Sequence, residues 1–206
     1  MLGNANRDRS GERRESTRAE ILDAAWGVAR EKGLAQVTLR DVAHRIGMRA
    51  PSLYSYFASK NAIYDAMFGQ AWTAYLDLVD AVEPELPRSP RAALKVMAHT
   101  FFDYAVADLA RHQLMNQRTI PGFVPTPEAY APAVAVLERM RVHLVEFGVQ
   151  DQGSVDLVTA LIGGLVDAQQ ANDPGGDRWG RLLDDAMDMF ADHVGLPATT
   201  TTRSTH

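Results

Sequence analysis

The segment from Thr38 to Lys60, TLRDVAHRIGMRAPSLYSYFASK, predicts two short helices joined by a tight turn. Thr38 can cap the first helix, with Asp41 three residues later facing the free backbone N–H groups. Gly47 ends that helix, because glycine takes the left-handed conformation of a sharp turn at little steric cost. Pro51 suits the first turn of the second helix, where its missing N–H does no harm. The rest of the chain is organised around this pair of helices.

Ala43, Gly47 and Leu53 have the spacing of a DNA-binding helix-turn-helix, although many other helix pairs share this triplet. The run that begins at Leu53, LYSYFASK, is more specific. It resembles the TetR family of bacterial transcriptional regulators, whose signature is L-Y-x-[HY]-F, a short link, and Ser-Lys at the start of a long helix. The close match covers residues 16–68, and beyond it only length, helix content and helix order agree. The resemblance implies a dimeric regulator, by default a repressor, that a small-molecule inducer releases from a palindromic operator.

Composition indicates an ordinary soluble globular protein, with 46% apolar and 23% charged residues. The absence of Cys excludes disulfides, thiolate zinc sites and cysteine nucleophiles. No apolar run reaches the ~18 residues of a membrane span, and the polar N-terminus lacks the apolar core of a secretory signal. We therefore expect a cytoplasmic protein without membrane contact. The net charge of −5 divides into +4 for residues 1–60 and −9 for residues 61–206, which fits a basic DNA-binding domain joined to a larger acidic domain.

Helical periodicity without any strand pattern predicts an all-α fold of about nine helices. We expect a disordered arm over residues 1–15 and a three-helix DNA-binding domain over 16–60, with Ser16 or Thr17 capping its first helix. A larger helical domain for effector binding and dimerisation follows over 61–195. We expect its helices to begin at Ser59–Lys60, Ser89–Pro90, His112, Pro127, Asp151 and Arg178, and a disordered tail over 196–206.

The second helix of the pair is expected to lie in the major groove, which admits one α-helix and displays a distinct pattern for each base pair. Arg49 can reach a phosphate or make a bidentate contact to guanine, and Arg40 and Lys60 suit backbone phosphates. Tyr54 and Tyr56 offer hydroxyls and rings, with half-buried packing as the alternative. The resemblance places the family's DNA contacts on Arg40, Ala50, Pro51, Ser52, Tyr54, Ser55, Tyr56 and Lys60.

The resemblance also implies an effector cavity between the mid-chain helices. Candidate lining residues combine apolar groups with a few polar ones, as ligand sites tend to do, and plain core packing is the alternative for each. They are Trp72, His99, Phe102, Asp103, Met115, Phe123, Leu165 and Gln169. His99 and Asp103 lie four residues apart, but two possible ligands on one helix are weak evidence for a metal. We predict no metal and no cofactor.

Small residues on the penultimate helix predict a place where a second helix can approach closely. With apolar residues of the last helix they would form a four-helix bundle across a two-fold axis, and packing inside one subunit is the alternative. The predicted contact residues are Ala160, Gly163, Gly164, Ala168, Leu183, Met187 and Phe190. Dimerisation has a second motive, because a two-fold dimer reads a pseudo-palindrome.

Two other classes of protein are weighed against the regulator. An enzyme is disfavoured because the chain has no G-x-S-x-G, no phosphate-binding glycine loop, no H-E-x-x-H and no nucleophile beside a base. No catalytic residue is therefore predicted. An interaction module with a helix-turn-helix that no longer binds DNA remains open, and salt-dependent duplex binding would separate it from a regulator.

Overall fold

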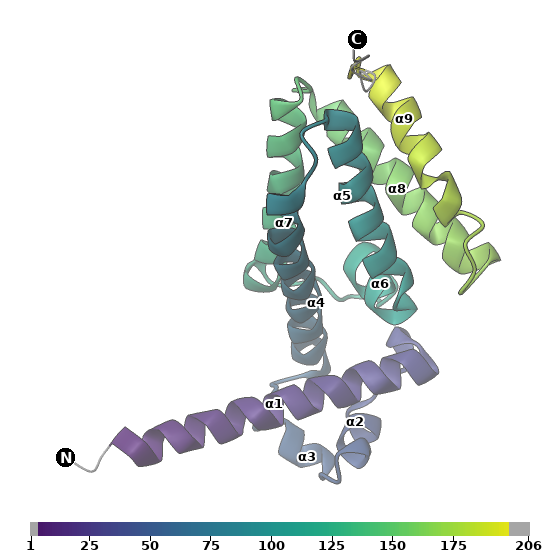
Figure 1. Cartoon of the computed structure of the whole chain (residues 1–206). Helices are drawn as coiled ribbons and strands as arrows, with labels where there is room; N and C mark the ends of the chain where they lie inside the picture. The colour runs from purple at the N-terminus through teal and green to yellow at the C-terminus, as the bar shows by residue number, and fades with distance from the viewer. Residues whose placement is uncertain (1–3, 198–206) are drawn as a thin grey trace, which may run out of the picture. The chain divides into compact units, whose positions relative to one another are not determined.

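The computed structural model describes residues 4–197, and over this range helices joined by loops are present and strands are absent (Figure 1). The α-helices are α1 (Asn4–Lys32), α2 (Leu39–Arg45), α3 (Ala50–Leu53), α4 (Lys60–Val82), α5 (Pro90–Val106), α6 (Leu109–Asn116), α7 (Pro127–Glu146), α8 (Gln152–Asn172) and α9 (Leu183–His193). Short 3-10 turns occupy Leu34–Gln36 (η1), Glu83–Glu85 (η2) and Gly180–Leu182 (η3). The all-α prediction, with about nine helices, is confirmed for the described residues.

The chain forms two compact units that do not coincide with the domains expected from the sequence. Unit 1 comprises the described residues up to Trp72 together with Ala110–Ala131, and unit 2 comprises Thr73–Leu109 together with the described residues from Pro132. Helices α4 and α7 therefore each run through both units. The segment Ala110–Ala131 joins the reader because it packs on the first half of α4, where Asp65 accepts hydrogen bonds from the Thr126 N–H (2.7 Å) and hydroxyl (2.9 Å).

The first helix begins earlier than predicted. Neither Ser16 nor Thr17 caps it, because α1 continues without a break from Asn4 to Lys32, through most of the expected disordered arm. The stretch lacks proline and is rich in Arg and Glu, which are good helix formers. Arg14 and Arg18, one turn apart, also hold this part of α1 against the segment after α3. The remainder of the expected arm, residues 1–3, lies outside the described residues.

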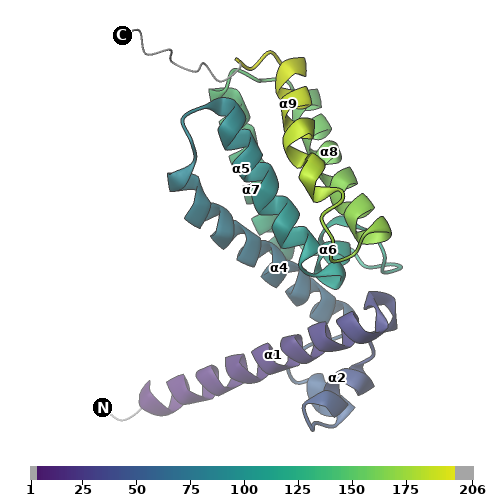
Figure 2. The ribbon, with the colours of Figure 1, turned by 45° about the vertical axis from the view of Figure 1, so that its right-hand side comes forward.

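Unit 2 is built around α5, which packs against both α8 and α9 (Figures 1 and 2). Its core contains Leu94 and Phe102 of α5, Val158 and Ile162 of α8, and an apolar stripe of α9. That stripe consists of Leu183, Met187 and Phe190, each no more than 2% exposed. These three predicted dimer contacts are therefore wrong, because a side chain buried in its own subunit has no surface left for a partner.

Two other helix boundaries in the body differ from the prediction. The helix expected to run to Arg111 ends at Val106, and α6 begins at Leu109, three residues before the expected start at His112. The last helix begins at Leu183, because the expected first turns from Arg178 are a hydrogen-bonded turn followed by η3. Helix α8 begins where the sequence predicts, and Asp151 caps it, since an Asp151 carboxylate oxygen accepts from the Ser154 N–H at 2.9 Å.

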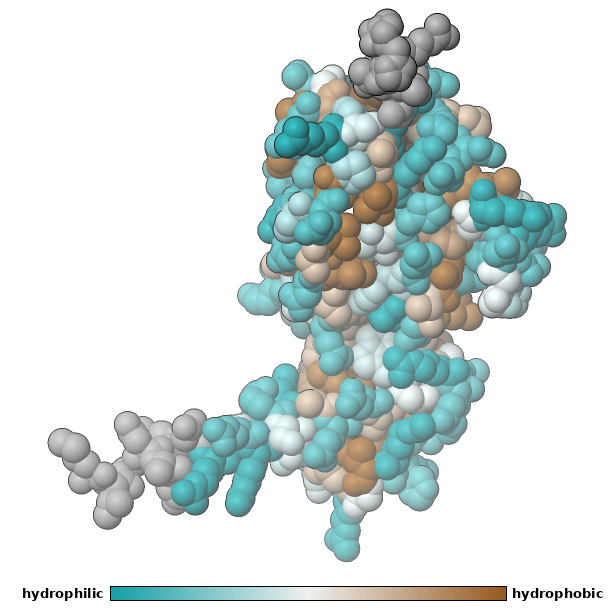
Figure 3. All heavy atoms as spheres, viewed as in Figure 1, coloured by the Kyte–Doolittle hydropathy of each residue, from teal (hydrophilic) through white to brown (hydrophobic). Residues whose placement is uncertain are grey.

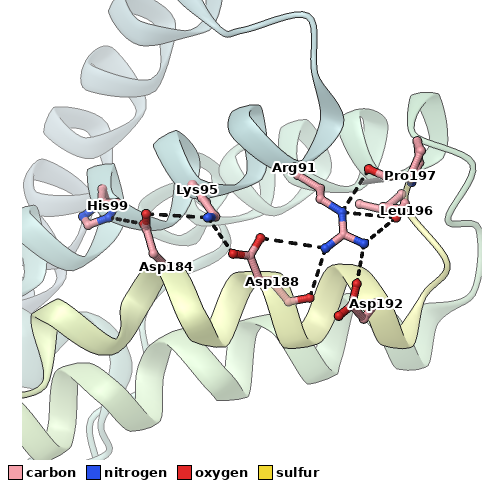
Figure 4. Close-up of polar contacts among 8 residues, drawn as sticks. All are labelled: Arg91, Lys95, His99, Asp184, Asp188, Asp192, Leu196 and Pro197. Carbon is pink, nitrogen blue, oxygen red and sulfur yellow. Dashed lines mark hydrogen bonds and ion pairs between the residues drawn. The ribbon is translucent and has the colours of Figure 1, made fainter. Parts of the chain in front are cut away.

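A ladder of charged side chains joins α5 to α9 (Figure 4). Arg91, Lys95 and His99 follow one another at four-residue intervals on α5 and so share one face. They meet acids at the same spacing on α9: His99 Nε2 lies 2.8 Å from Asp184 Oδ1, Lys95 Nζ lies 2.8 Å from Asp188 Oδ2, and Arg91 pairs with Asp192. We call this set of six residues the α5–α9 ladder.

The guanidinium of Arg91 also binds the chain beyond α9. It donates to the carbonyl oxygens of Leu196 (2.6 Å) and Pro197 (2.9 Å), and the Leu196 side chain is buried. These two residues were expected to belong to a disordered tail, and the structure shows them held in place. The rest of that tail, residues 198–206, lies outside the described residues.

Candidate nucleic-acid interface

The cap that begins α2 is formed as the sequence predicts. Thr38 Oγ1 accepts from the Asp41 N–H at 3.1 Å, and the Thr38 hydroxyl donates to Asp41 Oδ2 at 2.7 Å. Lys32 Nζ lies 2.8 Å from the other carboxylate oxygen. Hydrogen bonds from Lys32 and then Thr38 hold the pKa of Asp41 below its ordinary value. The carboxylate therefore stays charged and fixes the start of α2 against the end of α1.

The turn between α2 and α3 depends on Gly47, whose φ of 67° is in the left-handed region. The Met48 N–H closes the turn by donating to the Ala43 carbonyl at 2.8 Å. Helix α3 contains a single regular turn. Successive backbone hydrogen bonds continue as helical turns as far as Phe57. Leu53 and Phe57 are buried, so one side of this segment packs against the core of unit 1.

The outward side of α3 and its continuation is open to solvent. Tyr54 is 58% exposed, and the exposed set on this side is Arg49, Pro51, Ser52, Tyr54 and Ser55. Arg40, on α2, is exposed as well. Within the part of the chain that the structure describes, neither Arg40 nor Arg49 has an ion-pair partner. Both guanidinium groups are therefore available to a phosphate or a base edge.

Three predicted contact residues are less accessible than expected. Ala50 and Tyr56 are half-buried, and the guanidinium carbon of Arg14 lies 5.3 Å from the centre of the Tyr56 ring. The Lys60 ammonium donates to the Val37 carbonyl at 2.9 Å, so part of its hydrogen-bonding capacity supports the fold. The predicted cap of α4 is present beside it, because Ser59 Oγ accepts from the Ala62 N–H at 3.1 Å.

Two arginines that the sequence analysis did not single out position the end of the reading segment. Arg14 donates to the Ser55 carbonyl at 2.7 Å, and Arg18 donates to the Tyr56 carbonyl at 2.5 Å. The Arg18 guanidinium also stacks over the Phe57 ring at 4.3 Å. Their four-residue spacing places them on one face of a helix and could have predicted a shared contact. The prediction that residues 1–15 are disordered prevented this interpretation.

A third arginine braces α2 against α1. Arg45 pairs with Glu31 at 2.7 Å and crosses α1 at Gly27. A Cβ at position 27 would lie 2.8 Å from the guanidinium carbon of Arg45, which is closer than side-chain atoms approach. Gly27 therefore provides the space through which α2 is tied to α1, and the two helices form a firm support for α3.

The candidate effector residues are distributed over both units. In unit 1, Met115 and Phe123 line a cavity of about 220 Å³, and Trp72 is half-buried outside its lining. In unit 2, Phe102 is buried against Gly180, and the Gln169 side chain accepts from the Trp179 N–H at 2.8 Å. His99 belongs to the α5–α9 ladder. Asp103 is exposed and Leu165 is half-buried. A small pocket of about 40 Å³ in unit 2, between Tyr75, Met97 and His143, includes none of these five. For Phe102 and Gln169, the core-packing alternative therefore describes what the structure shows.

The remaining predicted dimer residues lie on α8. Ala160 and Gly164 are exposed, and Gly163 and Ala168 are half-buried. The same helix exposes Leu157, and Met189 on the neighbouring α9 is 71% exposed. Apolar patches interrupt the hydrophilic surface over the region of α8 and α9 in Figure 3. This face therefore has small and apolar residues at its surface, unlike the buried stripe of α9.

A capped helix pair whose second member turns an exposed edge outward, in a chain whose described residues form helices and no strands, has the geometry of a helix-turn-helix. The model of the tetR family of bacterial regulatory proteins matches residues 21–67, the part of the chain that holds this pair. This part of the chain is therefore similar to the tetR family of bacterial regulatory proteins. Within residues 4–197 no helix combines the length and apolar character needed to cross a membrane, and no three His, Cys, Asp or Glu residues gather as a metal site would require.

Individual relatives share part of this sequence, and solved structures share its fold. The transcriptional repressor KstR2 of Mycobacterium tuberculosis is 34% identical over 85 residues, which are 39% of this chain and 42% of KstR2. A TetR family regulator from Marinobacter aquaeolei VT8 shares the fold with a TM-score of 0.65 at 20% identity, covering 89% of this chain and 97% of that one. FadR of Bacillus subtilis, solved with stearoyl-CoA, has a TM-score of 0.63 at 15% identity, covering 87% and 99%. The chain spans about half the length of the curated relatives it matches.

Proposed function

We propose that the protein is a sequence-specific DNA-binding transcriptional regulator that acts as a repressor in the cytoplasm. The observation that carries the proposal is the open edge of α3, where Arg49, Ser52 and Tyr54 are exposed beside a buried anchor at Leu53. Such an edge suits the major groove, where side chains reach base edges. Arg40 supplies a phosphate contact beside it. The relatives named as repressors support the direction of regulation.

The regulator acts as a homodimer, because α3 alone reads too few base pairs to select one operator. The face that supports a two-fold contact is the exposed side of α8 and α9, with Leu157, Ala160 and Gly164 on α8 and Met189 on α9. Small residues permit close helix approach, and exposed apolar side chains gain by burial. This face replaces the buried α9 residues of the sequence-based prediction.

A small-molecule inducer releases the operator. DNA and inducer bind different arrangements of the dimer, so each lowers the affinity for the other by the same factor. FadR of Bacillus subtilis, whose structure contains stearoyl-CoA, shows that a protein of this fold can hold a small organic ligand. Helix α4 is the connecting element, because it begins in the reading unit and ends in the other.

The test is selection of preferred sequences from a random duplex library by the full chain, followed by affinity measurements over a range of salt. We expect one pseudo-palindromic motif and an affinity that falls steeply as salt rises, because released counterions drive binding. Replacing both Arg49 and Tyr54 by Ala should weaken binding roughly a hundredfold or more, since each base contact contributes about 1–3 kcal/mol. Arg88→Ala, an exposed charge in the loop before α5, is the matched control. Selection of no motif, or unchanged binding by the double variant, would contradict the proposal.

A further inference from the structure

Unit 1 contains a cavity of about 220 Å³ outside the helix-turn-helix. Its aromatic wall comes from Phe68 of α4, Tyr130 of α7 and Phe123 of the segment between α6 and α7, with Met115 of α6 completing the apolar side. The Phe68 and Tyr130 rings are stacked, with centroids 5.8 Å apart and planes 11° apart. An apolar cavity of about 150 Å³ holds a benzene ring, so this one accommodates a ring with a short substituent.

The same cavity has a polar side with one fixed charge. Arg118 lines it together with the neighbouring polar residue Gln117. The Arg118 side chain is exposed, and within the part of the chain that the structure describes no carboxylate pairs with it. A guanidinium is always charged and presents a planar fork that matches a carboxylate. Aromatic rings facing an unpaired arginine are the complement of a molecule with an aromatic body and an acidic head.

We propose that this cavity binds a small aromatic carboxylic acid, with the ring against Phe68, Phe123 and Tyr130 and the carboxylate on Arg118. The ring gains by leaving water and by contact with aromatic faces, which prefer offset or edge arrangements. The carboxylate gains a charge-assisted hydrogen bond that a neutral group of the same size cannot make. The regulatory consequence of binding, though not the site itself, rests on the proposed function.

The cavity is connected to the reader by contacts inside unit 1. The Phe123 ring packs on Tyr64, with centroids 5.7 Å apart, and the Tyr64 hydroxyl donates to the Leu34 carbonyl at 2.6 Å. Burial raises the pKa of Tyr64 to about 12, so this donor keeps its proton at every physiological pH. Leu34 opens η1, the turn that leads into α2. A ligand that displaces Phe123 therefore acts on the support of α2 and α3 through Tyr64.

Binding is tested by isothermal titration calorimetry of the full chain with phenylacetate, using 2-phenylethanol as the neutral analogue. Phenylacetate should bind, and 2-phenylethanol should bind at least about tenfold more weakly, because it lacks the charged acceptor. Arg118→Gln should weaken phenylacetate by roughly ten- to hundredfold and leave 2-phenylethanol unchanged. Arg88→Gln, which removes another exposed charge outside the cavity, should bind phenylacetate as the wild type does.

Three results would overturn the site: no heat with phenylacetate at millimolar concentration, equal affinity for the alcohol, or an undiminished affinity in Arg118→Gln. Tyr130→Ser provides a second test from the aromatic side, and it should weaken the acid and the alcohol alike. If Tyr130→Ser binds both as tightly as the wild type does, the ring is not where we place it.

The regulatory consequence has its own variant. Tyr64→Phe keeps the ring on Phe123 and removes the hydrogen bond to Leu34, so it should bind phenylacetate normally while operator affinity no longer responds. A full response in this variant would overturn the connection and leave the site standing. Duplex binding is measured first without ligand. Failure at that stage counts against the proposed function, whereas the calorimetric result for the cavity is independent of DNA.

Discussion

Replacing Arg91 by Met should destabilise the protein far more than replacing any other member of the α5–α9 ladder. The Arg91 side chain is only 12% exposed, and its guanidinium donates to the Leu196 and Pro197 carbonyls and pairs with Asp192. A hydrogen bond with a charged partner contributes about 1.5–3 kcal/mol. The freed acceptors lie near the surface and regain water, so we expect a net loss of ~2–3 kcal/mol rather than the sum of three bonds.

The other end of the ladder supplies the matched control. His99 and Asp184 are each about half exposed, and exposed pairs contribute roughly 0–1 kcal/mol, so His99→Gln should change stability by less than that. Urea unfolding followed by circular dichroism measures both variants, at one fixed protein concentration because the proposed dimerisation would make stability concentration-dependent. For a chain of this length Arg91→Met should lower the melting temperature by about 4–10 °C. Equal losses of stability in the two variants would refute the reasoning that a ladder residue contributes more when it is more buried.

Three further predictions concern the turn, the acid response and the dimer. Gly47→Ala should lower the free energy of unfolding in urea by about 1–2 kcal/mol, because alanine is strained at a φ of 67°. No neighbouring residue would contact the added Cβ, so backbone strain alone causes the loss. Unchanged stability would contradict this. The pKa of Asp184 is lowered, first by the hydrogen bond from His99 and then by Lys95. The stability that the Asp184 carboxylate contributes to the fold is therefore fully present above the ordinary pKa of 3.8 and is lost as pH falls through the lowered pKa. The stability difference between wild type and Asp184→Asn should therefore close in acid, and a difference constant with pH would count against it. If the proposed dimer forms through the exposed side of α8 and α9, Met189→Asp should be a folded monomer in analytical ultracentrifugation, whereas a persistent dimer would place the interface elsewhere.

The sequence was most informative where a local backbone requirement determined the residue. Thr38 was predicted as a cap, Gly47 as a turn residue and Asp151 as a helix start, and the structure has each of them at that place. Such features depend on residues within three or four positions, so one sequence contains all of the information.

Features that depend on distant contacts were not predictable in this way. The stripe of Leu183, Met187 and Phe190 was correctly predicted as apolar, but periodicity does not say whether the subunit's own core or a partner buries such a stripe. The start of α1 was missed because Arg14 and Arg18 acquire their partners some 40 residues away. The effector candidates were gathered by residue type alone, and of these only Met115 and Phe123 lie together in the unit 1 cavity.

The composition of unit 1 from two separate stretches of chain has a consequence for dissection and engineering. A fragment cut after Trp72 would contain every residue of the helix pair but would lack Phe123, Thr126 and Tyr130, the partners of Tyr64, Asp65 and Phe68. Its α4 would expose the aromatic rings of Tyr64 and Phe68 to water, which favours aggregation. Grafting this reader onto a foreign sensor module therefore requires exchanging two pieces of polypeptide together, and a single crossover point would produce a mismatched chimera.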